Sequence, residues 1–148
     1  MFDKEYMIDL FKNDNIEKVQ AKIILSDALT NSPSFTTNLA INNKNKLSIL
    51  WLVYLSTLEN KFLFTNSFDK IITTFDDLYL FIEYCRKKNI RKGMGRCVKR
   101  IVNTWIHDNL SSKDFNKNEL REILNITHPK FPEDTQFQNI LKGRCFNE

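Results

Sequence analysis

The chain has 148 residues, enough for one domain (1–148) with its own hydrophobic core, and 42% of them are apolar. Three glycines and three prolines are too few for a succession of β-hairpins, so the composition favours an all-α fold. Its three cysteines lack C-x-x-C spacing and only two histidines are present, which excludes a zinc-finger pattern or a disulfide framework.

Apolar spacing predicts two amphipathic helices at the start of the chain, over Met1–Lys12 and Ile16–Thr30. The expected buried side of the second helix consists of Val19, Ile23, Ile24, Ala28 and Leu29. The segment Asn31–Ser34 should end that helix, because it contains Pro33. The next residues, Thr36–Lys46, are polar and rich in asparagine, and we expect a surface loop with a turn of helix.

The most hydrophobic stretch, Leu47–Phe64, is predicted to form one central helix, followed by a short helix over Ser67–Ile72. Thr74 with Asp77 three residues later has the spacing of a capping box that opens a helix through Lys88. The apolar face of that helix should comprise Phe75, Leu78, Tyr79, Ile82 and Cys85, with Phe81 beside it.

The apolar run from Leu47 to Leu58 is too short for a bilayer, which takes about 20 residues. Acidic and basic residues interrupt the first ten positions, so no secretory signal is expected there. We therefore expect a cytoplasmic protein with reduced thiols and no membrane partner.

Basic residues gather in one segment, Arg86–His107, and no acid occurs from Tyr84 to His107. Its basic residues are Arg86, Lys87, Lys88, Arg91, Lys92, Arg96, Lys99 and Arg100. The whole chain has 22 Lys and Arg against 18 Asp and Glu, and without those eight it has 14 against 18. This asymmetry indicates an anionic partner at the segment, and nucleic acid is the first candidate.

Gly93-Met94-Gly95 should separate two helices, the second running from near Gly95 to about Asn109. Its apolar stripe is Cys97, Val98, Ile101, Val102, Trp105 and Ile106, and its opposite face holds Arg96, Lys99, Arg100, Asn103 and His107. The start of such a helix can bind phosphate through its free N–H groups. A solvated polar face is the alternative interpretation, and the alternative for Arg86–Lys88 is that these cations complement the dipole of a helix C-terminus.

The remaining chain is expected to contain a linker over Leu110–Phe115 and a short helix from Asn116 to about Ile126. An extended segment at His128–Pro132 and a last helix over Glu133–Lys142 follow. Helices of this length joined by short turns predict antiparallel pairs stacked as a fragment of an α-solenoid.

No motif of catalysis or cofactor binding occurs, so neither an enzyme nor a cofactor is expected. Cys97 lies between Arg96 and Lys99, which could activate its thiol, but its place on the apolar stripe favours a core residue. His107 is interpreted either as a surface histidine or as a residue that stacks on a base.

Two segments together resemble the telomerase–Ro–vault (TROVE) module of the Ro ribonucleoproteins. The first is Leu80–Ile106, with Gly93-Met94-Gly95-Arg96, Lys99-Arg100 and Trp105-Ile106; the second is Glu119–Lys130, which ends in Thr-His-Pro-Lys. The resemblance covers about residues 47–142 and implies a ring of HEAT-like helical repeats. It also implies binding of small structured RNAs and of single-stranded 3′ ends of misfolded RNAs. Arg96, His128 and Lys130 match the family, whereas a basic pair of the family corresponds to Ser111 and Phe115.

These observations predict an RNA-binding module for single-stranded ends or loops, as a component of a Ro-like ribonucleoprotein. The expected contacts are Arg91, Lys92, Arg96, Lys99 and Arg100 with phosphates, His128 with an unpaired base, and Lys130. The alternative is a helical protein-interaction scaffold without RNA binding, whose basic face meets an acidic protein patch. Self-association is a further possibility under either interpretation.

Overall fold

The computed structural model of the protein describes residues 3–14, 18–87 and 96–109. Within these ranges every regular element is an α-helix and no strand occurs, which confirms the all-α prediction. The chain divides into two compact units, Met1–Thr73 (unit 1) and Thr74–Glu148 (unit 2). The HEAT-like solenoid stays a prediction.

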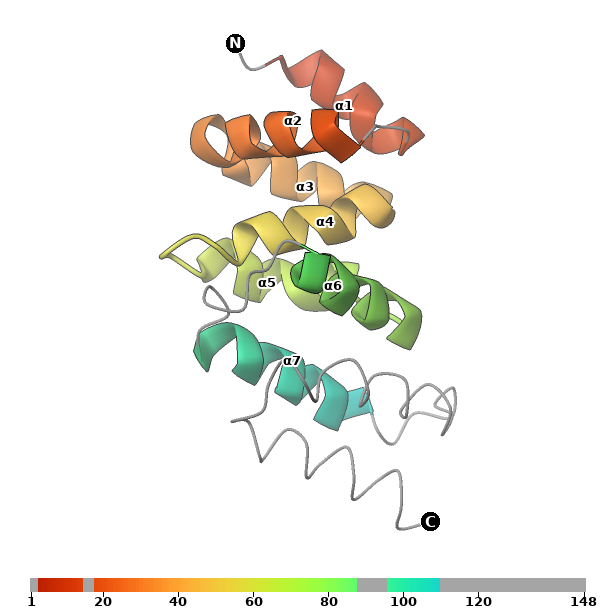
Figure 1. Ribbon diagram of the computed structural model, residues 1–148, viewed down its shortest axis with the longest axis vertical. Helices are drawn as coiled ribbons and strands as arrows, with labels where there is room; N and C mark the ends of the chain where they lie inside the picture. Colours follow the sequence, from red (N-terminus) through yellow and green to blue (C-terminus); the bar gives the residue numbers. More distant parts are fainter. Residues whose placement is uncertain (1–2, 15–17, 88–95, 110–148) are drawn as a thin grey trace. The chain divides into compact units, whose positions relative to one another are not determined.

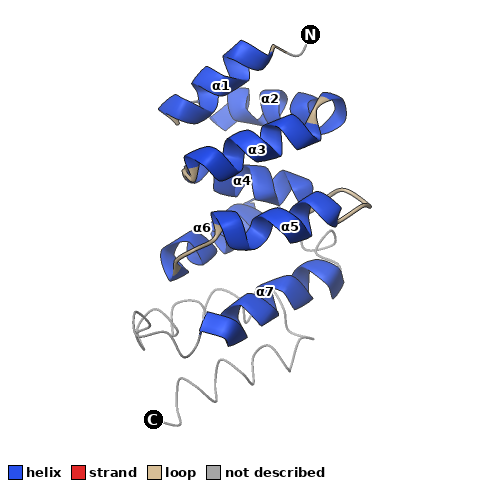
Figure 2. Ribbon diagram, turned by 180° about the vertical axis from the view of Figure 1, so that it is seen from behind, coloured by secondary structure: helices blue, strands red, loops and turns tan. Residues whose placement is uncertain are grey.

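Unit 1 contains five described helices arranged in two layers. They are α1 (Lys4–Asn13), α2 (Lys18–Asn31), α3 (Pro33–Asn43), α4 (Lys46–Leu55) and α5 (Phe62–Ile71). The views from opposite sides in Figures 1 and 2 agree that α1, α3 and α5 form one layer and that α2 and α4 form the other. Within the layers α3 contacts α1 and α5, and α2 contacts α4; α3 also packs against α2 and α4 across them.

Helix α4 is the centre of unit 1, as its composition predicts. Eight of its ten residues are buried, including Trp51, Leu52 and Val53 with no exposed surface. Its start is fixed by a capping box: Asn45 Oδ1 accepts from the Ser48 backbone N–H at 3.0 Å, and Ser48 Oγ accepts from the Asn45 N–H at 3.2 Å. The cap thus provides the Ser48 N–H in the first turn of this largely apolar helix with an acceptor.

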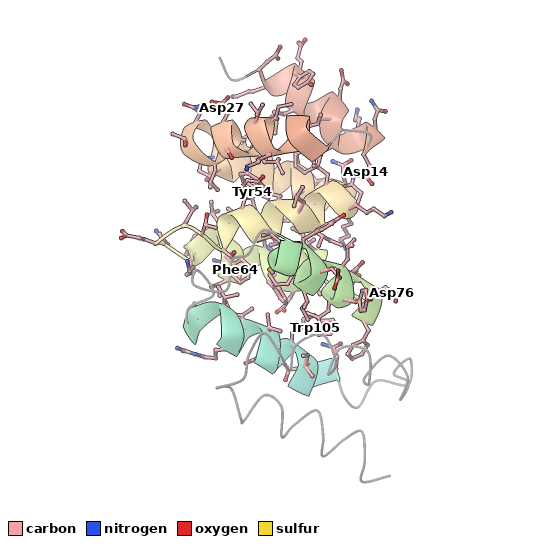
Figure 3. All side chains as sticks on the ribbon, in the orientation of Figure 1. Asp14, Asp27, Tyr54, Phe64, Asp76 and Trp105 are labelled. Atoms are coloured by element: carbon pink, nitrogen blue, oxygen red, sulfur yellow. The ribbon has the colours of Figure 1, made fainter. Side chains whose placement is uncertain are left out.

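Two side chains join the end of α1 to the start of α4. Asp14, in the left-handed conformation that ends α1, accepts the Leu47 backbone N–H through its carboxylate at 3.0 Å (Asp14 is labelled in Figure 3). Asn45 donates its side-chain N–H to the carbonyl of Phe11 in the last turn of α1. Each helix end thus supplies a partner to the other, although the residues are more than thirty positions apart in sequence.

The phenol of Tyr54 is buried where α4 meets α2 (Figure 3). Burial raises the pKa of Tyr54 above its ordinary value, because the charged phenolate is poorly solvated there. The Lys22 ammonium and a hydrogen bond with the Ser26 side chain, both from α2, act in the opposite direction. The buried phenol of α4 is therefore close to two exposed residues of α2, Lys22 and Ser26.

The loop prediction for Thr36–Lys46 is wrong, because Pro33–Asn43 forms helix α3. Pro33 occupies the first turn, where its missing N–H costs nothing. Thr36 and Thr37 are buried, and their hydroxyls donate to the carbonyls of Ser32 and Pro33 at 2.8 Å each. These bonds satisfy polar groups inside the helix, so a segment without a clear apolar period packs into the core.

The single helix predicted over Leu47–Phe64 is two helices, since α4 ends at Leu55 and α5 begins at Phe62. Ser56 and Thr57 donate their hydroxyls to the carbonyls of Val53 and Tyr54, both at 2.6 Å, and so compete with continued helix formation. The Lys61 ammonium caps the turn by donating to the Ser56 carbonyl at 2.7 Å. The short helix predicted at Ser67–Ile72 is the second half of α5.

The predicted apolar faces of α1 and α2 are only partly buried. Met7, Leu10 and Phe11 of α1 lie in the core, whereas Tyr6 is 49% exposed. In α2 the core residues are Ala21, Leu25 and Ala28, and Ile23 is 66% exposed. The face of α2 that packs into the core is therefore the one with Ala21, Leu25 and Ala28, and Ile23 lies outside it.

Unit 2 contains two described helices, α6 (Phe75–Lys87) and α7 (Arg96–Asn109). The predicted capping box is confirmed: the Thr74 N–H donates to Asp77 Oδ2, and the Asp77 N–H donates to Thr74 Oγ1, both at 3.1 Å. The predicted stripe of α6 is also confirmed, with its members buried apart from Tyr79, which is 36% exposed.

None of the described helices is long and apolar enough to cross a membrane. The glycine turn at Gly93–Gly95 and every element predicted after Asn109 lie outside the described residues.

Candidate nucleic-acid interface

Helix α7 carries the larger described part of the basic segment, whereas Arg86 and Lys87 end α6, and α7 begins and ends where the sequence predicts. Its apolar stripe is confirmed: Val98, Val102, Trp105 and Ile106 are buried, and Cys97 and Ile101 are half-buried. A helix with one buried face must turn its other side away from the core. The burial pattern therefore defines which side of α7 is available to a partner.

Trp105 fixes α7 against α6. Its ring is only 5% exposed, and it meets the ring of Phe75 edge-on, with centroids 5.2 Å apart and planes at 77° (Trp105 is labelled in Figure 3). Aromatic pairs favour this geometry because the edge of one ring is positive and the face of the other is negative. Trp105 is thus a core residue of unit 2, as its place on the stripe predicts.

Three of the predicted RNA-binding residues, Arg96, Lys99 and Arg100, lie in the first five residues of α7. At about 3.6 residues per turn, the position of Arg100 falls on the side of the helix opposite Val98 and Trp105. Arg100 is exposed. The first five residues of one helix therefore include three cationic residues.

The other four predicted site residues, Arg91, Lys92, His128 and Lys130, lie outside the described residues. Of the predicted site, helix α7 therefore contains only Arg96, Lys99 and Arg100. That these residues and His128 contact the same RNA stays a prediction.

The cysteines take two different positions. Cys85 is a buried thiol, as predicted, whereas the Cys97 thiol is half-buried at the start of α7, and Cys145 lies outside the described residues. In the described part of the chain, no cluster of histidine, cysteine and acidic side chains has the grouping that a metal ion needs.

Sequence reasoning missed two exposed residues beside the cations, Thr104 and Asp108. Thr104 lies one turn after Arg100, and Asp108 lies one turn after Thr104, on the same line along α7. Asp108 is the first acid after the acid-free run from Tyr84 to His107. The position where that run ends is therefore the sequence signal for this residue.

Comparison of the sequence with protein-family models and curated proteins, and of the fold with solved structures, finds no significant match. The resemblance to the TROVE module therefore stays a prediction, supported by the motifs of the chain itself.

Proposed function

We propose that the protein binds single-stranded ends or loops of RNA through the basic segment, as a component of a small ribonucleoprotein. The observation that carries the proposal is the charge of this segment together with the two faces of α7. Eight cations occur without an acid from Tyr84 to His107, and Val98, Val102, Trp105 and Ile106 of α7 are buried. A basic surface on a helix with a fixed inner face matches the repeating negative charge of a nucleic acid.

In this proposal each group has a distinct task. Arg91, Lys92, Arg96, Lys99 and Arg100 neutralise successive phosphates, and Lys130 adds a further cation. His128 stacks on or hydrogen-bonds an unpaired base, since a neutral imidazole adds little to phosphate attraction near pH 7. The packing of Trp105 on Phe75 holds α7 in place, so its cations need little reordering on binding.

The same proposal includes a reducing, cytoplasmic location, which suits the reduced thiols of Cys85 and Cys97. It also includes the TROVE relationship and its HEAT-like fold. A raised 260/280 nm absorbance ratio of the purified protein would be the first sign of a bound nucleic acid.

The test is the salt dependence of binding to a single-stranded oligouridylate. The logarithm of the affinity should fall with the logarithm of salt concentration by about 0.7 per phosphate neutralised. Four or five contacts give a slope of about −3 to −3.5, and Lys99→Gln with Arg100→Gln should flatten it by about 1.4. Fluorescence anisotropy over a salt series measures both slopes.

A matched control replaces Lys12 and Lys70, two exposed lysines of α1 and α5, by glutamine. This control has the same change in net charge and should keep the original slope. No binding at low salt, or binding that salt does not weaken, would contradict the proposal and favour a helical scaffold for an acidic protein.

A further inference from the structure

The exposed side of α7 changes the sign of its charge along the helix. Arg100, Thr104 and Asp108 are all exposed and follow one another at intervals of four residues. Such residues lie on one line, each about 6 Å further along the axis. A cation and a carboxylate thus lie about 12 Å apart on one exposed line, with a neutral threonine between them.

The charged residues of α7 are sorted by position as well as by sign. Arg96, Lys99 and Arg100 all lie in its first five residues, and Asp108, its only acid, is the last residue but one. Interactions between exposed charges are screened over about 8 Å at physiological ionic strength. A phosphate beside Arg100 is therefore largely screened from the Asp108 carboxylate. A phosphate that approaches the last turn of α7 is close enough to be repelled by that carboxylate.

We propose that Asp108 is a specificity-determining residue that ends the RNA footprint on α7. Phosphates bind along the first two turns, up to Arg100, and the strand leaves the helix near Thr104 because the Asp108 carboxylate repels the next phosphate. This inference rests on the proposed function and adds to it the point at which the bound RNA leaves α7. The single strand follows only the first half of the helix.

Two variants of one position test the boundary. Asp108→Asn removes the repulsion, so the affinity for an oligouridylate that extends past Arg100 should rise about threefold at low salt, and this gain should vanish at high salt. Asp108→Lys adds a cation at the same place. Its slope of log affinity against log salt should become steeper by about 0.7, because one more phosphate is neutralised.

The matched control is Asp9→Lys, which makes the same charge change at an exposed position of α1 in unit 1. This control distinguishes an effect at the end of α7 from an effect of the protein's total charge. It should leave the slope of log affinity against log salt unchanged. Melting temperatures of all variants establish that each is folded.

The outcomes distinguish this inference from the proposed function. If the unaltered protein does not bind the oligouridylate at low salt, the RNA-binding proposal and the boundary both fail. If it binds with the expected salt slope but Asp108→Lys leaves that slope unchanged, the boundary alone is overturned. The same holds if Asp9→Lys steepens the slope as much as Asp108→Lys does.

Discussion

At the scale of single residues, Trp51 shows how polar groups enter the core of unit 1. The ring has no exposed surface, and its indole N–H donates to the Thr37 hydroxyl at 2.9 Å. Thr37 in turn donates to the Pro33 carbonyl at 2.8 Å. This chain of two hydrogen bonds connects α4 to α3 and leaves no unpaired indole N–H in an apolar environment.

Thr37→Val keeps the shape of the side chain and removes its hydroxyl. The Trp51 N–H then loses its acceptor, so we expect the free energy of unfolding to fall by about 1–3 kcal/mol. Thr37→Ser is the control, because it keeps the hydroxyl and loses one methyl group, worth about 0.8 kcal/mol. Urea unfolding measures both, and a valine variant no less stable than the serine variant would contradict the role of the bond.

At the scale of elements, the charges of α7 are ordered differently from those of α1 and α6. Acids stand in the first turn of α1 (Glu5) and of α6 (Asp76 and Asp77), where they stabilise the positive helix end. Helix α7 has no acid in its first turn, begins with Arg96 and carries Asp108 in its last turn. Each charge in such a place costs about 0.3–1 kcal/mol, so α7 depends on packing for its stability.

Trp105→Ala should therefore destabilise unit 2 strongly. Removal of a buried tryptophan that packs on Phe75 should cost roughly 3–5 kcal/mol and lower the melting temperature by well over a few degrees. Thr104→Ala, at the exposed neighbouring position, should stay within about 0.5 kcal/mol of the original. Thermal unfolding followed by circular dichroism compares the two, and a shift of only a degree or two for Trp105→Ala would contradict its core position.

Local sequence rules predict α6 and α7 well and α3 poorly, for a physical reason. The capping box at Thr74 and the apolar stripe through Trp105 are signals contained within one helix. The helicity of α3 depends on Thr36 and Thr37, whose hydroxyls reach back to carbonyls and whose burial depends on neighbouring helices. The exposure of Ile23 likewise follows from the packing of Ala21 and Ala28, which the sequence period does not contain.

At the scale of the whole molecule, the candidate site was predictable in part. The exposure of Arg100 follows from the helical period of the apolar residues in α7, because the buried residues define the opposite side as the exposed one. The proposed boundary at Asp108 lies just after the acid-free run that ends at His107, so the composition of that run does not contain it. Links between distant segments, such as Asp14 with Leu47, leave no period or motif in the sequence.

The chain's two tryptophans fall one in each compact unit, with Trp51 in unit 1 and Trp105 in unit 2, and both are buried. The fluorescence of each tryptophan therefore reports on the unfolding of one unit.

Trp51→Phe leaves only tryptophan emission from unit 2, and Trp105→Phe leaves only tryptophan emission from unit 1. We expect their denaturation curves to have different midpoints, because each unit has its own buried core. Bound oligouridylate should shift the curve reported by Trp105. Superimposable curves without ligand would instead mean that the two units unfold in one cooperative step.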